Sequence, residues 1–368
     1  MSRSRDIATI LGLTETANSD NAALSTGGGT TVSFIDSDGL LPSADLAGDS
    51  GDLVFSRSSN GLFVCEGGYY RKLSSNSLVT AEMLLIGGGG GGSSGGGGAG
   101  GLLYYGSEIG RAADEEDYER NPNGSAINID VGKTYTVVIG SGGARYNNGD
   151  NSTVTATGVS YIAYGGGSGA TPWGETPSNY AIGSGHRGAN GGSGGGGGGN
   201  TAVGSNTLWG GDNTPGQGFP GGNGQEVGNS PAGGGGGAGS RGGSASSGSA
   251  NSSIGGSGLE YSITGTATFY AGGGGGGSHN AGRADGRHGG GNGAINNGLS
   301  TAGTANTGGG GGGGGYNHAN TATNALGGSG VCILKTASTL TTTGTVTADS
   351  DGNGFNIYTF TGNGTFRV

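Results

Sequence analysis

Uninterrupted runs of glycine recur through most of this 368-residue chain and restrict its possible folds more than any other feature. Glycine has no Cβ, so a run packs no side chains and loses more conformational freedom on folding than any other sequence. A run is therefore either a flexible linker or a segment held by backbone hydrogen bonds to its neighbours. The runs lie at residues 87–92, 95–98, 194–199, 233–237, 272–277 and 308–315.

Their recurrence favours an ordered lattice of polyglycine helices. A polyproline-II helix has about three residues per turn and makes no internal hydrogen bonds, so each N–H and C=O must reach a neighbouring helix. Without Cβ atoms, neighbours can approach from every side. Collagen is excluded, because the runs have no strict Gly-X-Y period and the chain has only 7 prolines. Flexible linkers and silk-like disorder stay as alternatives.

Composition divides the chain into four segments. We expect an attachment segment at 1–27, a small β module at 28–80, a glycine-rich polyglycine-helix domain at 81–335 and a C-terminal β-hairpin segment at 336–368. The predicted fold class is all-β and irregular: strands and hairpins beside the lattice, with little α-helix. One short helix is expected at 5–13, where apolar residues recur on one face.

Strands are predicted where β-branched and aromatic residues cluster between turn residues. A turn at Asn60-Gly61 should join two of them, and a turn at 361–364 should form the terminal hairpin. The expected strand segments are 31–35, 53–56, 62–65, 69–73, 127–130, 134–139, 153–164, 259–270, 355–360 and 365–368.

The charge balance excludes several classes of partner. A net charge of −10 and a pI near 4.7 argue against a nucleic-acid-binding surface and against attraction to an anionic membrane. No stretch approaches the roughly 20 apolar residues of a membrane span, and no secretion signal is recognisable. Cys65 and Cys332 lie far apart without a CxxC spacing, so both are expected to be free thiols.

Catalytic and metal-binding patterns are weak throughout. Gly132-Lys133-Thr134 resembles the end of a phosphate loop, but Ile127 stands where that motif needs glycine, and a strand is predicted after it. The four histidines (His186, His279, His288 and His318) have no metal-ligand spacing. We therefore expect no enzyme, cofactor or metal site. The acidic run at 114–119 predicts a solvated loop, with a cation or basic-receptor contact as the alternative.

Aromatic side chains between the glycine runs are the best candidates for recognition. A lattice interior admits almost no side chains, so bulky residues should lie on loops, and aromatic residues among Asn, Ser and Gly are typical of adaptable binding loops. Small local cores are the alternative for each residue singly. The predicted receptor-binding residues are Trp173, Tyr180, Trp209, Phe219, Tyr316 and His318, on loops at 171–182, 200–220 and 316–326.

Apolar segments that enter and leave the glycine runs carry a family resemblance. They are 82–86 before six glycines, 132–143, 327–334 and 358–366. Together they resemble the glycine-rich domain of phage tail-fibre proteins, and more narrowly the glycine-rich tip adhesin of T-even-like long tail fibres. In those adhesins a sandwich of polyglycine helices carries loops that contact host outer-membrane protein or saccharide. The N-terminal 80 residues and the extra C-terminal β segment depart from that adhesin.

The resemblance implies a structural virion protein, located in the tail fibre and released by lysis. Its expected partners are a host cell-surface glycan or outer-membrane protein and other virion tail proteins. A homotrimer is expected, with a monomeric tip as the alternative. A different class of function also stays open: a structural subunit of a non-viral extracellular filament or glycine-rich matrix.

Overall fold

The computed structural model divides the chain into two compact units, Met1–Ser77 and Leu78–Val368. In the first unit the structure describes only the backbone of the strands. In the second it describes residues 78–112, 123–171, 187–199, 208–225, 231–245, 253–278, 284–296, 298–315 and 325–368, and the backbone of 119–120 and 207. No α-helix occurs among these residues, which confirms the predicted fold class.

The first unit contains a six-stranded sheet in the order β1-β2-β3-β4-β5-β6. Its strands are β1 (Thr14–Glu15), β2 (Ala23–Ser25), β3 (Thr31–Ile35), β4 (Leu53–Ser56), β5 (Gly61–Glu66) and β6 (Tyr69–Leu73). Strands β4 and β5 pair antiparallel with Ser56 opposite Gly61, so the predicted hairpin is confirmed, although Gly61 belongs to the strand. The helix predicted at 5–13 lies outside the described residues.

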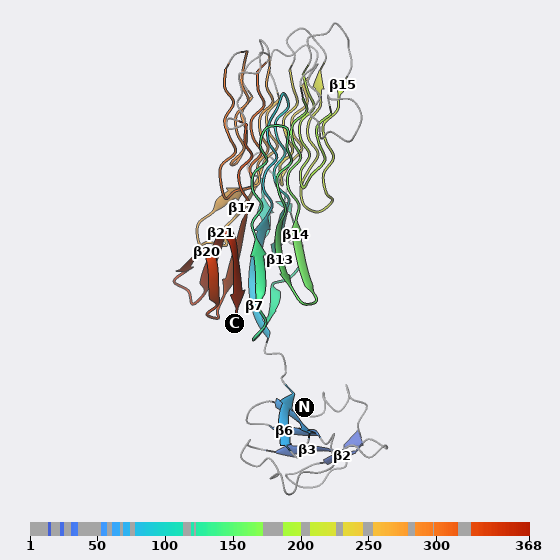
Figure 1. Cartoon of the computed structure of the whole chain (residues 1–368), viewed down its shortest axis with the longest axis vertical. Helices are drawn as coiled ribbons and strands as arrows, with labels where there is room; N and C mark the ends of the chain where they lie inside the picture. Colours follow the sequence, from blue (N-terminus) through green and yellow to red (C-terminus); the bar gives the residue numbers. More distant parts are fainter. Residues whose placement is uncertain are drawn as a thin grey trace. The chain divides into compact units, whose positions relative to one another are not determined.

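The second unit is built on a nine-stranded antiparallel sheet in the order β11-β7-β19-β21-β12-β13-β14, to which β8 adds along β7 and β20 along β21. Strands β13 and β14 return to contact β7, so the sheet is a nearly closed barrel (Figure 1). Its strands are β7 (Leu78–Ile86), β8 (Leu102–Tyr105), β11 (Ile127–Asp130), β12 (Tyr135–Val138), β13 (Ser152–Ala156), β14 (Val159–Ala163), β19 (Val331–Thr336), β20 (Thr341–Ser350) and β21 (Asn356–Arg367).

Strand β7 shows why this sheet has two apolar cores. Alternate side chains of a strand point to opposite faces. Met83 and Leu85 pack into one core with Phe360 and Phe366, whereas Leu84 packs into a second core. That second core is covered by a smaller sheet in the order β10-β9-β17-β18. The smaller sheet comprises β9 (Gly110–Arg111), β10 (Glu119–Arg120), β17 (Leu259–Tyr261) and β18 (Thr268–Tyr270).

The C-terminal hairpin differs from its prediction. Residues 361–364, expected to form a turn, lie inside β21, which runs unbroken from Asn356 to Arg367. The hairpin is instead made by β20 and β21, with Ser350 opposite Asn356. Gly362 and Gly364 are typical turn residues, but β12 and β20 both pair along this half of β21, and the register between β20 and β21 shifts between Gly344 and Val346. Tertiary pairing thus overrides the local turn preference.

Above the sheet, the glycine runs form the predicted lattice. Successive N–H groups of the 87–92 run point to three different segments in turn. Gly87 and Gly90 donate to 98–101, Gly88 and Gly91 to 147–150, and Gly89 and Gly92 to 325–328, all at 2.7–3.0 Å. A three-residue period without internal hydrogen bonds is the geometry of the polyproline-II helix. The run's hydrogen-bonding pattern therefore confirms the polyglycine helix.

The same run is enclosed by three further segments. Gly166 donates to Gly88 O, Gly143 to Gly89 O and Gly311 to Gly90 O. A Cβ added at any glycine of 87–92 would lie within 3.0 Å of a carbonyl oxygen of 163–167, 140–144 or 308–312. Each position of this central helix must therefore be glycine.

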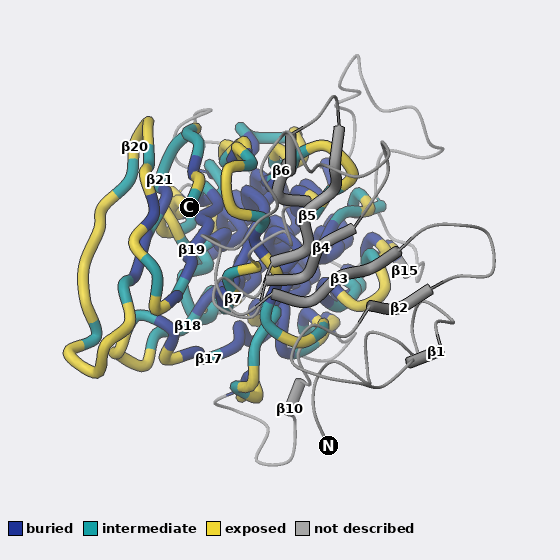
Figure 2. Tube along the Cα trace, turned by 90° about the horizontal axis from the view of Figure 1, so that it is seen from below, coloured by how far each residue is buried: buried dark blue, intermediate teal, exposed yellow. Residues whose placement is uncertain are grey.

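We call the whole set of bonded segments the polyglycine lattice. It consists of 87–101, 140–151, 164–171, 187–199, 208–225, 231–245, 253–258, 271–278, 284–296, 298–315 and 325–330. It includes the short pair β15 (Thr207–Leu208) and β16 (Gly224–Gln225). In Figure 2 the buried positions gather in the middle of the unit and the exposed ones concentrate on β20 and on outer turns.

Strands and helices of this unit are continuous with each other. Strands β7, β14 and β18 lead directly into glycine segments, and segments 253–258 and 325–330 lead into β17 and β19. A net hydrogen bond contributes about 0.5–1.5 kcal/mol, whereas ordering a residue's backbone costs about 1–2 kcal/mol. By these values the lattice hydrogen bonds fall short of the conformational entropy that their own glycines lose. The apolar cores of the barrel must supply the remaining stability and fix where each helix starts.

Candidate functional site

The two ends of the polyglycine lattice carry different kinds of residue. At the sheet end the helices continue into strands. At the opposite end, which we call the distal end, several segments stop at one level. The Ser94 hydroxyl accepts a hydrogen bond from Gly199 N–H at 3.1 Å, and Ser94 O accepts one from Gly277 N–H at 2.9 Å. Gly92 N–H reaches Ala325 O at 2.7 Å at the same level.

Several stretches of the chain leave the described lattice at this distal end. Thr171, Gly199, Gln225, Ser278 and Gly315 are the last described residues before such stretches. Four of the predicted receptor-binding residues belong to them and lie outside the described residues: Trp173, Tyr180, Tyr316 and His318. In the sequence, Trp173 and Tyr180 follow Thr171 by two and nine residues, and Tyr316 and His318 follow Gly315 by one and three.

Trp209 is described, and its side chain is exposed to 61%. Its backbone belongs to the lattice, because Trp209 O accepts a hydrogen bond from Gly188 N–H at 3.0 Å. Gly210 and Gly211 point inward, where an added Cβ would lie within 3.0 Å of neighbouring carbonyl oxygens. With three residues per turn, Trp209 and Asp212 lie on the same outward face of their helix, about 9 Å apart along the axis.

The neighbouring helix presents a matching pair of polar side chains. Arg187 Nη2 forms an ion pair with Asp212 Oδ2 at 2.7 Å. Three residues further along, Asn190 Oδ1 accepts a hydrogen bond from Asp212 N–H at 2.8 Å. We call this strip, consisting of Arg187, Asn190, Trp209 and Asp212, the Trp209 face.

A known protein family matches most of the chain. The model of the glycine-rich domain family matches residues 66–337. The chain belongs to the glycine-rich domain family. No curated protein and no solved structure matches it significantly.

Phe219, the other predicted residue of the glycine-rich domain that is described, lies apart from Trp209. Its N–H donates to Gly237 O and its O accepts from Gly194 N–H, both at 3.0 Å, and its side chain is half-buried. Asn223 Oδ1 accepts the N–H of Gly210, next to Trp209. Phe219 is four residues from Asn223 and therefore about 12 Å along the lattice. The two aromatic residues therefore lie at different levels along the lattice.

Sequence reasoning missed the polar half of the Trp209 face. Arg187, Asn190 and Asp212 were not singled out, although their spacing of three from each other or from Trp209 is the signal of a common outward face in this type of helix. It also missed the turn at Arg145 and Tyr146. There the Arg145 guanidinium lies 4.3 Å from the Tyr146 ring centroid, and Tyr146 has a positive φ of 72°.

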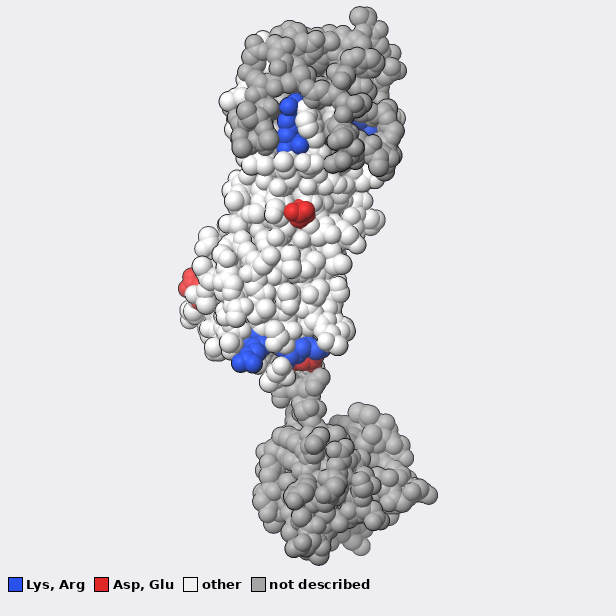
Figure 3. All heavy atoms as spheres, viewed as in Figure 1, with Lys and Arg blue, Asp and Glu red and all other residues white. Residues whose placement is uncertain are grey.

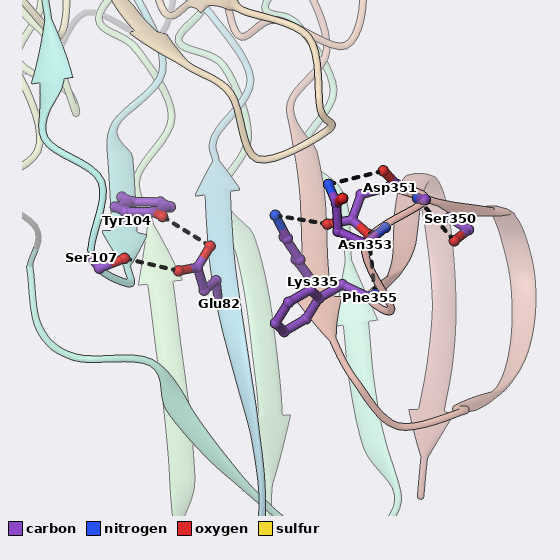
Figure 4. A network of polar contacts seen from close by, with 9 residues as sticks. Glu82, Tyr104, Ser107, Lys335, Ser350, Asp351, Asn353 and Phe355 are labelled. Carbon is purple, nitrogen blue, oxygen red and sulfur yellow. Dashed lines mark hydrogen bonds and ion pairs between the residues drawn. The ribbon is translucent and has the colours of Figure 1, made fainter.

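A polar network at the sheet end of the glycine-rich domain has a structural role (Figure 4). The Tyr104 hydroxyl donates to Glu82 at 3.2 Å, and Ser107 donates to the same carboxylate. Burial raises the pKa of Tyr104, and the adjacent Glu82 carboxylate raises it further. The hydroxyl therefore stays protonated and serves as a donor that joins β8 to β7.

On the other side of the network, Asp351 closes the β20–β21 hairpin. Its carboxylate accepts the N–H groups of Asn353 and Phe355 at 2.8 and 3.1 Å, and Lys335 Nζ lies 3.2 Å away. The Asn353 and Phe355 N–H groups and the Lys335 ammonium lower the pKa of Asp351. The Asp351 carboxylate, the two N–H groups and the Lys335 ammonium bond to each other and so stabilise the hairpin turn.

The histidine and cysteine side chains of the described residues have structural surroundings. Within the described residues, no three His, Cys, Asp or Glu side chains converge as metal ligands. His288 Nδ1 accepts the Gly258 N–H at 3.0 Å, and its ring stacks on Phe269. Cys332 is a free, fully buried thiol. No helix in the described part of the chain is long and apolar enough to cross a bilayer.

Proposed function

We propose that this chain is a non-enzymatic protein of a bacteriophage tail fibre or fibre tip, and that it binds a receptor on the host cell surface. One observation supports the proposal most directly. The chain enters the second unit at Leu78, in the barrel, whereas the undescribed side-chain-bearing stretches leave from the distal end of the lattice. An adhesin needs a stiff body between the end at which the chain enters and the end that carries the recognition residues, and the second unit provides such a body.

The surface of the lattice supports the same proposal. Figure 3 shows few charged side chains on the viewed face of its body. Backbone and small residues discriminate poorly between partners, so specificity must come from the larger side chains at and near the distal end. The receptor is a saccharide or an outer-membrane protein, and the protein acts in the virion together with other tail proteins.

Binding to cells tests this function. Fluorescently labelled full-length protein is incubated with a panel of bacterial strains, and bound label is measured by flow cytometry. We expect saturable binding to a subset of strains. Trp173→Ala with Trp209→Ala should reduce affinity by at least about thirtyfold, because aromatic anchors dominate most interfaces. Phe355→Ala, at an exposed aromatic in the barrel, is the matched control and should bind like the parent.

Two results would contradict the proposal: no binding to any strain, or equal loss of binding in the Phe355 control. Antibody labelling of phage particles provides an independent check, since label on structures other than tails would place the protein elsewhere.

A non-viral filament is the second candidate, and strand β20 is the observation that favours it. Within the described residues β20 pairs only with β21, and all ten of its residues are exposed or half-exposed. A long exposed edge strand can pair with another copy of the chain. Negative-stain images at rising protein concentration separate the candidates: uniform long filaments favour the matrix, whereas discrete monomers or trimers favour the fibre.

A further inference from the structure

The Trp209 face combines an exposed aromatic ring with a fixed ion pair. Among the described residues, no large apolar side chain is more exposed than Trp209 at 61%. Keeping an indole in water forgoes the stabilisation that burying a large apolar side chain provides. Asp212 and Arg187 stand beside it on the outer faces of two adjacent helices, with side chains exposed to 66% and 42%.

The backbone segments that carry these side chains are held by hydrogen bonds to each other. Gly188 N–H bonds to Trp209 O at 3.0 Å, and Gly191 N–H bonds to Asp212 O at 3.2 Å, so the two helices are tied at both ends of the strip. Asn190 adds a side-chain bond to the backbone of Asp212. A ligand would therefore meet side chains whose backbones are already ordered, which reduces the entropy lost on binding.

The chemistry of the strip matches a sugar chain. An indole face packs against the apolar C–H face of a pyranose ring, while an ion-paired carboxylate and guanidinium offer adjacent acceptors and donors to its hydroxyls. Trp209 and Asp212 are about 9 Å apart along the helix, which is longer than one ring. The strip therefore accommodates at least two linked rings.

The charge of the strip and the size of its apolar surface restrict the class of ligand further. Because Arg187 and Asp212 neutralise each other, the strip has no net charge with which to attract an anionic sugar. A stable protein partner would need an interface of about 1,000 Å² with an apolar centre. Around Trp209 the lattice offers glycine, alanine and asparagine instead, as at Gly188, Ala189 and Gly210.

We infer that the Trp209 face binds an uncharged oligosaccharide, with one ring stacked on Trp209 and the next hydrogen-bonded to the Arg187–Asp212 pair. This assignment rests on the proposed receptor binding and names the ligand class and the polar residues of that site. It also places a binding surface on the flank of the lattice.

Titration of the full-length protein with neutral oligosaccharides of one to four rings tests the assignment. Gluco-, manno- and N-acetylglucosamine series serve as probes, with sialyllactose as the anionic comparison, and calorimetry gives the affinity. We expect binding to at least one neutral series, an increase of at least about tenfold from one ring to two, and no preference for the anionic sugar. Trp209→Ala should weaken binding about thirtyfold.

The polar variants complete the test. Asp212→Ala should weaken binding of the two-ring ligand by about tenfold and leave the one-ring ligand unchanged, since the first ring contacts only Trp209. Leu299→Ala, at another exposed apolar position of the lattice, is the control. Failure of every neutral series to bind, or equal binding by parent and Trp209→Ala, overturns the inference. If cells are still bound in that case, the proposed function stands with a different ligand, such as an outer-membrane protein.

Discussion

The barrel and the polyglycine lattice satisfy their backbones in opposite ways. In the barrel, hydrogen bonds run between paired strands and side chains such as Leu85 and Phe360 fill the interior. In the lattice, hydrogen bonds extend in several directions around each helix, and the interior glycine positions leave no room for a Cβ. The barrel interior is therefore specified by the volume of its side chains, whereas the interior of the lattice is specified by the lack of a Cβ at each glycine.

The largest expected effect comes from adding that carbon in the lattice. A Cβ on Gly311 would lie within 3.0 Å of Ala325 O, and one on Gly312 within 3.0 Å of Asn292 O. Backbone oxygens of neighbouring helices cannot move aside without breaking further bonds. We expect Gly311→Ala to cost at least about 4 kcal/mol, and Gly311→Val with Gly312→Val to abolish cooperative folding, as measured by thermal and denaturant unfolding.

The control for this substitution is Gly158→Ala, in the turn between β13 and β14. Gly158 has a φ of 76° and nothing within 4 Å of an added Cβ. It should lose only the strain of that backbone conformation, about 1–2 kcal/mol. Equal losses at Gly158 and Gly311 would mean that the glycine runs are not closely packed.

In the barrel, the expected effect depends on the volume of the side chain. Leu85 is fully buried in the core that also contains Phe360. Leu85→Ala should cost about 2–5 kcal/mol, because a cavity forms, whereas Leu85→Met should cost less than about 1.5 kcal/mol. Urea unfolding of the three proteins measures both. If the methionine variant were as unstable as the alanine variant, the distinction between barrel and lattice would fail.

A smaller effect is expected from Asp351 and should depend on pH. Its pKa is lowered in the folded protein from an ordinary value of 3.8. The stabilisation is therefore fully present above pH 3.8 and is lost as the pH falls through the lower folded value. Asp351→Asn should melt below the parent at neutral pH, and the gap should close in acid. Asp349→Asn is the matched control, and a gap that persists at pH 2 would exclude this linkage.

The smallest effect on stability is expected at the Trp209 face. Trp209 projects into solvent and its helix is held by backbone bonds, so Trp209→Ala should change the unfolding free energy by less than about 0.5 kcal/mol. Differential scanning calorimetry checks this. A loss of several kcal/mol would mean that Trp209 is part of a core, and any binding defect of the variant would then reflect unfolding.

Much of the architecture could be predicted from the sequence because its signals are local. Glycine runs without a collagen period predict helices that bond outward, and the strands at 31–35 and 53–56 coincide with β3 and β4. The unpredictable part is the choice of neighbours. Gly88 bonds to Asp150 O, and Gly89 to Gly328 O, yet glycines are chemically identical and carry no information about their partners.

For the candidate site, the sequence indicates the aromatic residues between glycine runs but not their polar neighbours. The side chain of Trp209 is exposed, and its role in binding stays a prediction. The pairing of Arg187 with Asp212 depends on which two helices are adjacent, and this is decided by the arrangement of the whole lattice. The arrangement of the lattice also decides that Phe219 lies at a different level along the lattice from Trp209.

The way in which the stems of the distal stretches are held has an evolutionary consequence. Gln225 N–H bonds to Pro231 O at 3.1 Å, and Gly243 N–H bonds to Ile254 O at 2.9 Å, so main-chain hydrogen bonds join the described residues on either side of the stretches 226–230 and 246–252. Any sequence can be inserted between such ends, and doubling its length costs only about 0.6 kcal/mol in loop-closure entropy. The stretches can therefore be exchanged as cassettes, by recombination in nature or as randomised libraries in the laboratory, while the scaffold that displays them stays unchanged.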